Sequence, residues 1–239
     1  MNVVILAAGD FPRKPYPLYL LEQADALVCC DGAVRAALRH GLKVDAVVGD
    51  MDSAPGVFRN PGACSPLAPG SLSQTLGAGA HSDSRLAGFC GEVVHIAEQD
   101  DNDLTKALRY VLERYPSATD ITILGATGKR EAHTVGNLSL LMEYEKQYGF
   151  WARGISVQMV SDWSTAFAVG DTCTLSVGEG RAVSLFTCDP SLQVRSDGLQ
   201  WPLEGVRFDN WWRATLNRAT ADEIRLEFSH PAPLLVILD

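Results

Sequence analysis

The sequence lacks the features of a membrane protein and of a general nucleic-acid binder. No apolar stretch in its 239 residues approaches the roughly 20 residues that span a bilayer. The formal net charge of −9 argues against binding to nucleic acid or to an anionic membrane surface. The segment Met1 to Gly9 contains no basic start of the kind found in signal peptides, and it is typical of a first core strand. We therefore expect no nucleic-acid partner and no membrane partner.

Metal-binding cysteine patterns are also missing. None of the six cysteines has C-x-x-C spacing or a partnered histidine, so a zinc site is not expected. Cys29 and Cys30 end an apolar run, which favours reduced, buried thiols over a disulfide framework. We expect a cytoplasmic protein. Its hydrophobic content of 46% indicates a folded globular chain.

What is present is an alternation of strand-like and helix-like segments over the first two thirds of the chain. The strand-like segments are residues 3–7, 26–30, 46–48, 93–97 and 121–124, and the helix-like segments are residues 33–40, 104–115 and 135–142. This alternation predicts a largely parallel sheet with helices on its faces, in a Rossmann-like α/β domain over residues 1–153. Residues 54–91 interrupt the pattern with proline, glycine and serine and indicate a long surface excursion, either a lid or a mobile decoration.

The last third has a different texture. Short strand-like runs with turn residues between them follow residue 154, and residues 223–228 alternate between polar and apolar without exception. No strong helical period occurs there. These features predict a small C-terminal β-sandwich over residues 154–239.

Asp50 and Asp52 are the most informative residues. They follow the apolar run Ala46-Val47-Val48, and if the chain stays extended they lie on one side at the strand's carboxyl end. Ligands of open α/β sheets bind at that end, and two adjacent carboxylates suit a site that holds Mg²⁺. The alternative is an acidic surface turn without a ligand.

A second acidic cluster runs from Glu98 to Asp103, directly before a predicted helix. One of Asp101, Asn102 and Asp103 is expected to cap that helix. The cluster holds more acidic groups than a cap needs, and it follows another strand at the same sheet edge. Lys106 lies one turn after Asp103 and could reach a phosphate, although it could equally be a solvated partner of Asp103.

Two further strand ends carry polar residues. The segment Gly125 to Thr134 combines glycines, Lys129 and Arg130 before a helix, which is a plausible phosphate site although it is no Walker A motif. Such a loop can also be purely structural, and His133 alone is more often structural than catalytic. Asp31 follows the second strand, where it is either a helix cap or part of the same acidic edge.

In order, the chain carries Asp-Gly-Ala at 31–33, Gly-Asp-Met-Asp-Ser at 49–53, Gln-Asp-x-x-Asp-x-x-Lys-Ala-Leu at 99–108 and Gly-x-x-Gly-x-Arg-x-x-His-Thr-x-x-Asn at 125–137. Together with Gly-Leu-Gln-Trp-Pro-Leu at 198–203, this order resembles the thiamine pyrophosphokinase family. The resemblance implies Mg²⁺-dependent transfer of pyrophosphate from ATP to thiamine, giving thiamine diphosphate and AMP, in a homodimer.

Roles for single residues follow from the same resemblance. The expected catalytic residues are Asp52, Asp100 and Asp103; the metal ligands are Asp50, Asp52 and Asp103; the ATP-binding residues are Asp31, Gln99, Lys106, Arg130, His133 and Thr134; and the thiamine-binding residues are Trp201, Thr215 and Asn217. An indole face at Trp201 suits a thiazolium cation, although a core position in the β-domain is the alternative for this residue.

The chain departs from the family pattern at three places. Ala132 stands where the family has an aspartate beside its histidine, and Glu131 is a possible substitute. Lys129 replaces a loop glycine, and Leu216 replaces a small polar residue. Two alternatives to the kinase therefore stay open: a thiamine- or nucleotide-binding sensor without activity, and a Mg²⁺-dependent nucleotide hydrolase.

Overall fold

The first half of the molecule is a parallel sheet. The structure is a computed structural model, and it describes residues 1–52 and 89–239. Six strands run parallel in the spatial order β6-β5-β1-β2-β3-β4. Their bounds are β1 Asn2–Leu6, β2 Ala26–Cys30, β3 Ala46–Gly49, β4 Glu92–His95, β5 Asp120–Leu124 and β6 Ser156–Val160.

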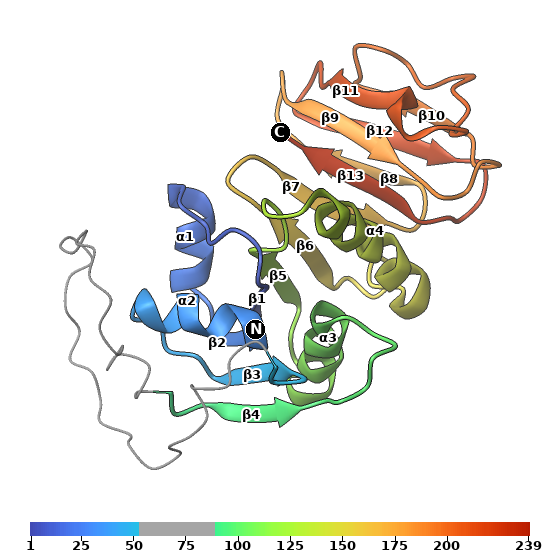
Figure 1. Cartoon of the computed structure of the whole chain (residues 1–239). Coiled ribbons are helices and arrows are strands. Elements are labelled where there is room, and N and C mark those ends of the chain that lie inside the picture. Colours follow the sequence, from blue (N-terminus) through green and yellow to red (C-terminus); the bar gives the residue numbers. More distant parts are fainter. Residues whose placement is uncertain (53–88) are drawn as a thin grey trace.

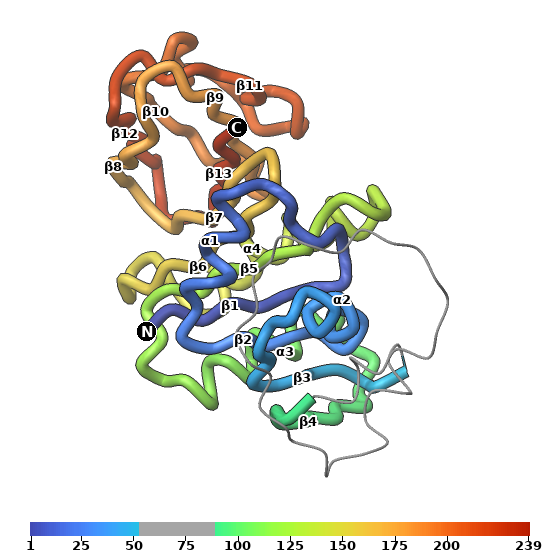
Figure 2. The backbone as a smooth tube through the Cα atoms, turned by 90° about the vertical axis from the view of Figure 1, so that its left-hand side faces the viewer, coloured from blue at the N-terminus to red at the C-terminus, as the bar shows by residue number. Residues whose placement is uncertain are grey.

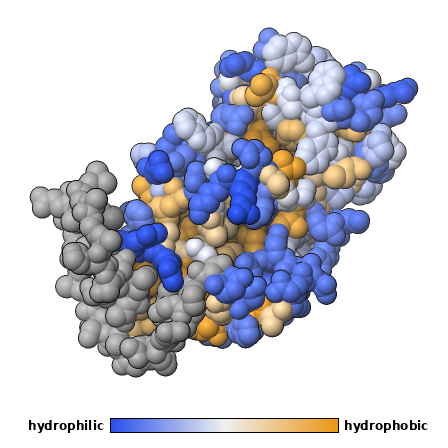
Figure 3. Space-filling model, in the orientation of Figure 1, coloured by the Kyte–Doolittle hydropathy of each residue, from blue (hydrophilic) through white to orange (hydrophobic). Residues whose placement is uncertain are grey.

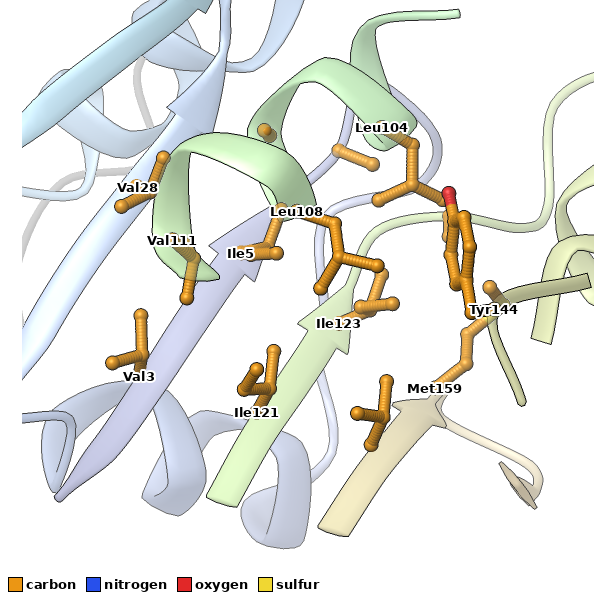
Figure 4. Packing of buried hydrophobic residues seen from close by; sticks show 14 of the residues in the cluster. Val3, Ile5, Val28, Leu104, Leu108, Val111, Ile121, Ile123, Tyr144 and Met159 are labelled. Atoms are coloured by element: carbon orange, nitrogen blue, oxygen red, sulfur yellow. The ribbon is translucent and has the colours of Figure 1, made fainter. Parts of the chain in front are cut away.

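Helices cover both faces of this sheet because its strands are apolar on both sides. α1 (Pro15–Glu22) and α2 (Val34–Arg39) lie on one face, where Val4 and Leu6 are buried beneath them (Figure 1). The opposite face carries α3 (Asp103–Arg114) and α4 (Glu131–Tyr148) (Figure 1). Figure 4 shows Leu104 and Leu108 of α3 packed on Ile5 and neighbouring strand residues on this side. Successive strand residues point to opposite faces, so each strand contributes to both cores.

The strand order reverses beside β1. The chain first proceeds outward from β1 through β2 and β3 to β4, and then returns by α3 to place β5 on the other side of β1. This reversal is a topological switch point, and ligands of such sheets bind in the crevice at the carboxyl ends of the strands. The arrangement sets the position of the site described below.

A β-sandwich follows. The strands β7 (Thr165–Val169), β13 (Leu234–Leu238), β9 (Ala182–Phe186) and β11 (Ala214–Arg218) are antiparallel and extend the parallel sheet to ten strands. A second sheet has the order β10-β12-β8 and consists of β10 (Val194–Asp197), β12 (Glu223–Phe228) and β8 (Cys173–Ser176). An apolar core that includes Val183, Leu185, Ile224 and Leu226 lies between the two layers. Figure 2 shows this sandwich above the α/β part.

The predicted fold class, an α/β part followed by a β-sandwich, is confirmed. The sequence did not predict α1, β7, β10 or β11; α1 carries Pro15 and Pro17, and few residues of β10 and β11 are apolar. β6 was expected to open the β-domain, whereas it pairs parallel with β5. The sheet thus crosses the predicted domain boundary at residues 153 and 154, and that boundary stays a prediction. The surface excursion was predicted for residues 54–91. Residues 54–88 of it lie outside the described residues.

The predicted thiols are found at Cys29 and Cys30, which are free and buried. Burial raises the pKa of both far above the ordinary value. Cys90 is disulfide-bonded, which the sequence did not predict. Within residues 1–52 and 89–239, no helix combines the length and the apolar composition that crossing a bilayer requires.

Candidate active site at the carboxyl edge of the parallel sheet

The predicted catalytic and ATP-binding residues emerge at one edge of the sheet. Asp31 follows β2, Asp50 follows β3, and Gln99 lies in the loop between β4 and α3. The glycine loop that begins at Gly125 follows β5. Because these strands are parallel, all four loops leave the sheet at its carboxyl edge. Residues far apart in the sequence are thereby brought together.

Three carboxylates gather at this edge. Asp31, Asp50 and Asp52 can each place one oxygen within 4.8 Å of the other two. Asp31 is only 1% exposed, whereas Asp52 is exposed to solvent. Gly49 makes this possible, since a Cβ atom at that position would lie 2.9 Å from Cγ of Asp31. The sequence placed Asp31 among the ATP-binding residues, and the structure puts it beside the predicted metal ligands.

A turn, not an extended strand, brings Asp50 and Asp52 together. Met51 between them has φ 66°, in the left-handed region that costs a non-glycine residue roughly 1–2 kcal/mol. The backbone N–H of Asp52 donates a hydrogen bond of 3.2 Å to Oδ1 of Asp50. The prediction that an extended chain aligns the two carboxylates is therefore wrong in its geometry. Strained residues of this kind are concentrated at functional sites.

Asp103 and Lys106 lie on the first turn of α3, facing the same acidic group. Nζ of Lys106, which is 2% exposed, lies 3.5 Å from Oδ1 of Asp103. Burial raises the pKa of Asp103, and the charges of Asp50 and Asp52 raise it further, while Lys106 lowers it. The side chain of Asp103 is thus held in an excess of negative charge, which a bound cation would relieve.

The loop between β4 and α3 is held in a defined shape. Nε2 of Gln99 donates to Oδ2 of Asp50 at 3.2 Å, and the pKa of Asp50 is lowered by the Asp52 N–H and then by this amide. Arg109 of α3, which the sequence did not single out, binds Glu98 at 2.8 Å and Asp101 at 2.5 Å, on either side of Gln99 and the exposed Asp100.

The capping prediction for this loop is confirmed at one residue. Oδ1 of Asn102 accepts the N–H of Thr105 at 2.9 Å, so Asn102 is the N-cap of α3. Asp101 and Asp103 are not needed for capping, and they are bound instead to Arg109 and Lys106.

The glycine loop after β5 interlocks with the loop after β1, which the sequence analysis missed. The N–H of Gly9 donates to O of Gly125 at 2.5 Å, and that of Asp10 donates to O of Thr127 at 2.9 Å. Nζ of Lys129 donates to O of Ala8 at 2.6 Å. The two loops lie at the switch point, and the signal that could have found the first is the Gly-Asp pair that ends the first apolar strand.

The predicted phosphate-binding residues occupy the start of α4. Arg130 is its N-cap residue, and both Arg130 and His133 are exposed. Oγ1 of Thr134 accepts the N–H of Gly128 at 3.4 Å, so Thr134 links the helix to the glycine loop. The helix N-terminus presents its partial positive charge there, beside the Arg130 guanidinium. At Ala132, which is exposed, there is no carboxylate.

The predicted thiamine-binding residues lie on the sandwich. Trp201 is 55% exposed, so the alternative of a buried core tryptophan is excluded. Asn217, which is 4% exposed, holds the Trp201 backbone: Oδ1 accepts its N–H at 3.1 Å, and Nδ2 donates to its carbonyl at 2.6 Å. Thr215 is exposed and donates to O of Trp212. The geometry makes Asn217 a residue that positions the indole.

These residues are far from the acidic edge within one chain. Asn217 lies on β11, and seven strands separate β11 from β3 in the ten-stranded sheet. At about 4.8 Å between neighbouring strands, this corresponds to on the order of 35–40 Å. The structure therefore gathers Asp50 and Asp52 with Asp31, and it places Asp103 near enough for their charges to act on it but outside the group within 4.8 Å. It does not bring Trp201 to them.

Comparisons with known proteins agree with this arrangement. The family model for the catalytic domain of thiamin pyrophosphokinase matches residues 82–150, and the model for its substrate-binding domain matches residues 166–231. Together the two segments make up more than half of the chain. The chain belongs to the thiamin pyrophosphokinase family. As a member it is an enzyme of the transferase class that acts as a thiamin pyrophosphokinase, with thiamine and ATP as its substrates.

Solved structures of this family share the fold. The thiamine pyrophosphokinase from Bacillus subtilis matches with a TM-score of 0.71 and 18% identity, over 100% of this chain and 99% of that chain. A family protein from Enterococcus faecalis gives the same values. The enzyme from Candida albicans matches with a TM-score of 0.65 and 16% identity, over 99% of this chain and 89% of that one. No curated protein matches the sequence.

Proposed function

We propose that this chain transfers the terminal pyrophosphoryl group of ATP to the hydroxyl group of thiamine in a Mg²⁺-dependent reaction, giving thiamine diphosphate and AMP. The observation that carries the proposal is the gathering of Asp31, Asp50 and Asp52 within 4.8 Å at the carboxyl edge of the sheet. The glycine loop and the start of α4 lie at the same edge. We also keep the prediction of a cytoplasmic location.

The acidic group fits a magnesium ion. Its ligand atoms are carboxylate oxygens only, which is the donor type that Mg²⁺ prefers. Asp50, Asp52 and Asp103 would hold the ion, as predicted, and the position of Asp31 adds a fourth carboxylate. When bound, Mg²⁺ neutralises polyphosphate charge and polarises phosphoryl oxygens.

The protein's own residues would orient the polyphosphate. Lys106, buried beside Asp103, and Arg130, at the start of α4, would supply positive charge at this edge of the sheet. Gln99 fixes the Asp50 carboxylate through its amide. His133 and Thr134 would support the phosphates from the first turn of α4.

In the reaction, the thiamine hydroxyl oxygen attacks the β-phosphorus of ATP in line. A new bond forms between that oxygen and the β-phosphorus, and the bond from the β-phosphorus to the bridging oxygen of AMP breaks. Asp100, exposed in the loop between β4 and α3, would accept the hydroxyl proton. Most of the acceleration comes from alignment and from charge neutralisation.

We further propose that the active unit is a homodimer. Measured across the sheet, β3 and β11, the strand that holds Trp201, are on the order of 35–40 Å apart in one chain, which no side chain can bridge. A second copy could place its own Trp201 over the first copy's acidic edge, and C2 symmetry would then build two equivalent sites. The indole face, with Thr215 beside it, would hold the thiazolium cation.

One incubation tests the proposed activity. The chain is mixed with ATP, Mg²⁺ and thiamine, and the products are separated by chromatography. We expect AMP and thiamine diphosphate in equal amounts. An Asp52→Asn variant should lose on the order of 100-fold or more in turnover. ADP or free pyrophosphate with unchanged thiamine would instead indicate the hydrolase, and binding without turnover would indicate the sensor.

A further inference from the structure

A cavity of about 430 Å³ lies on the α4 side of the molecule, away from the residues discussed so far. It is bounded by α4, by the loop that follows this helix and by the strands β6 and β7. The cavity lies at the amino-terminal end of β6. This end of the sheet is opposite to the edge that carries the acidic group. The volume of the cavity is in the range of pockets that bind small molecules.

The cavity exists because two neighbouring strands diverge. β7 pairs with β13 over its whole length, but it pairs with β6 only through residues 158–160 of β6. The first residues of β6, Ser156 and Val157, are paired on their other side with β5. The space between the strands at this point is lined by the aromatic residues Phe150, Trp151 and Phe167 and by aliphatic neighbours. Figure 3 shows apolar side chains reaching the surface between the two lobes of the molecule.

Among the described residues, Glu145 of α4 is the one acidic residue that lines this cavity. It is 7% exposed, and within the described part of the chain it forms no ion pair. Its Oε2 accepts the N–H of Trp151 at 2.9 Å, and the N–H of Phe150 also faces the carboxylate and favours its charged form. Burial raises the pKa of Glu145, and these two N–H groups oppose that rise. A buried carboxylate is ordinarily paired with a cation.

The rest of the local structure keeps this carboxylate in place. Gly170 allows its approach, because a Cβ atom there would lie 2.6 Å from Oε1 of Glu145. The two N–H groups belong to the residues that follow the C-cap of α4. The end of the helix therefore holds the carboxylate in position, and the carboxylate holds the chain that follows the helix. The carboxylate is thus held at the wall of an aromatic cavity by hydrogen bonding, and no cation of the described residues lies within ion-pair distance of it.

We propose that this cavity binds a small organic cation with an aromatic body, with Glu145 as the counter-charge and the surrounding rings as the apolar contact. An ammonium group would complete the pairing of the carboxylate, and the rings would enclose the apolar part of the ligand and add cation–π attraction. The site is separate from the proposed catalytic site, since none of the residues assigned to that site lines it.

A matched pair of probes tests this directly. Tryptamine and tryptophol share one indole body and differ in carrying an ammonium or a hydroxyl group. By titration calorimetry on the full chain, we expect tryptamine to bind about tenfold more tightly than tryptophol. Glu145→Gln should remove that preference, while Glu143→Gln, an exposed substitution on the same helix, should leave it unchanged.

Two further variants locate the binding. Trp201→Ala disables the proposed thiamine site. Tryptamine should still bind to this variant with unchanged affinity, because the cavity beside Glu145 is intact. Ala168→Leu fills the cavity from β7 and should abolish binding of both probes, while turnover of thiamine is retained; near-ultraviolet circular dichroism checks that each variant is folded.

Four results would overturn the proposal. They are equal binding of the two probes, no binding of either, loss of tryptamine binding in Trp201→Ala, and a change of oligomeric state on Ala168→Leu. The last result would mean that a second copy of the chain covers the cavity.

Discussion

Single glycine and left-handed positions set the geometry of the acidic group. Gly49 allows the buried Asp31 to approach the end of β3, and the left-handed Met51 folds Asp52 back toward Asp50. The left-handed backbone at Met51 is unfavourable by itself, and the position of Gly49 admits no side chain. Together they place three like charges in a small volume, which is a costly arrangement without a cation.

Substitution of Gly49 tests this account. A Cβ atom would lie 2.9 Å from Cγ of Asp31, so Gly49→Ala should displace the carboxylate. We expect kcat/KM to fall about tenfold or more, with a loss of about 1–3 kcal/mol in the free energy of unfolding. Gly136→Ala is the matched control, since nothing lies within 4 Å of its Cβ position. It should stabilise α4 by up to about 1 kcal/mol and leave activity unchanged. Equal activity of the two variants would contradict the role of Gly49.

Leu216 offers a test of strain at the other predicted site. It has φ 54° and is 66% exposed, so its side chain contributes little packing while its backbone is strained. Leu216→Gly should raise the free energy of unfolding by about 0.5–1 kcal/mol in chemical denaturation. Leu216→Ala removes most of the same side chain but keeps the Cβ atom, and it should not stabilise. A destabilised glycine variant would show that the side chain, and not the backbone, dominates.

At the scale of elements, α3 both packs against the sheet and positions residues of the candidate site. Its apolar face covers the sheet (Figure 4). Its first turn supplies Asp103 and Lys106 beside the acidic group. Its outer face supplies Arg109, which holds the loop from Glu98 to Asp101 by two ion pairs. The helix therefore fixes the loop that carries Gln99 and Asp100, without Arg109 itself reaching the substrate in the proposed mechanism.

Arg109 should act as a positioning residue. Arg109→Gln removes both ion pairs, and we expect kcat to fall about tenfold with little change in KM for thiamine. Exposed pairs contribute little to folding, so the free energy of unfolding should change by less than about 1 kcal/mol. Arg114→Gln, an exposed substitution later on the same helix, is the control. A loss of stability that matches the loss of activity would indicate a purely structural role.

On the scale of the whole molecule, one sheet carries both the acidic group and the strand that holds Trp201, and it keeps them apart. The acidic edge lies near one end of the ten strands, and Trp201 is attached to the strand at the other end. The strands of this sheet are hydrogen-bonded to one another without a break. A hinge motion that brought the two together within one chain would have to break this hydrogen bonding, which is costly. In the proposed mechanism the site needs both, and it would therefore be assembled from two copies of the chain.

Mixing two inactive variants tests assembly from two copies. Asp52→Asn lacks a predicted metal ligand, and Trp201→Ala lacks the predicted aromatic platform. If each site combines residues of two chains, a mixed dimer contains one intact site, and random reassortment should restore about a quarter of the wild-type activity. Each variant alone should stay inactive at the same total concentration. Absence of recovery after confirmed exchange of subunits, measured with differently tagged chains, would show that one chain supplies the whole site.

Particular residues explain which elements and which site residues could be predicted from the sequence and which could not. Periodicity was sufficient for α3 and β12, because their apolar residues recur at regular spacing over most of their length. It failed for α1, which has two prolines, and for β10 and β11, in which few residues are apolar. In the acidic group, strand-end carboxylates were found because each follows an apolar run. Arg109 and Gly9 were missed because their importance depends on contacts with distant segments.

By itself, the sequence determined the alternation of strands and helices, the β-rich final third and the set of carboxylates that end the parallel strands, because these depend on local patterns of apolar and polar residues. The tertiary structure alone decided that Asp31 joins Asp50 and Asp52, that a left-handed turn replaces an extended strand at Met51, and that Trp201 is kept away from them. Those outcomes depend on strand order and on close contacts between loops, and neither is encoded in any short segment of the chain.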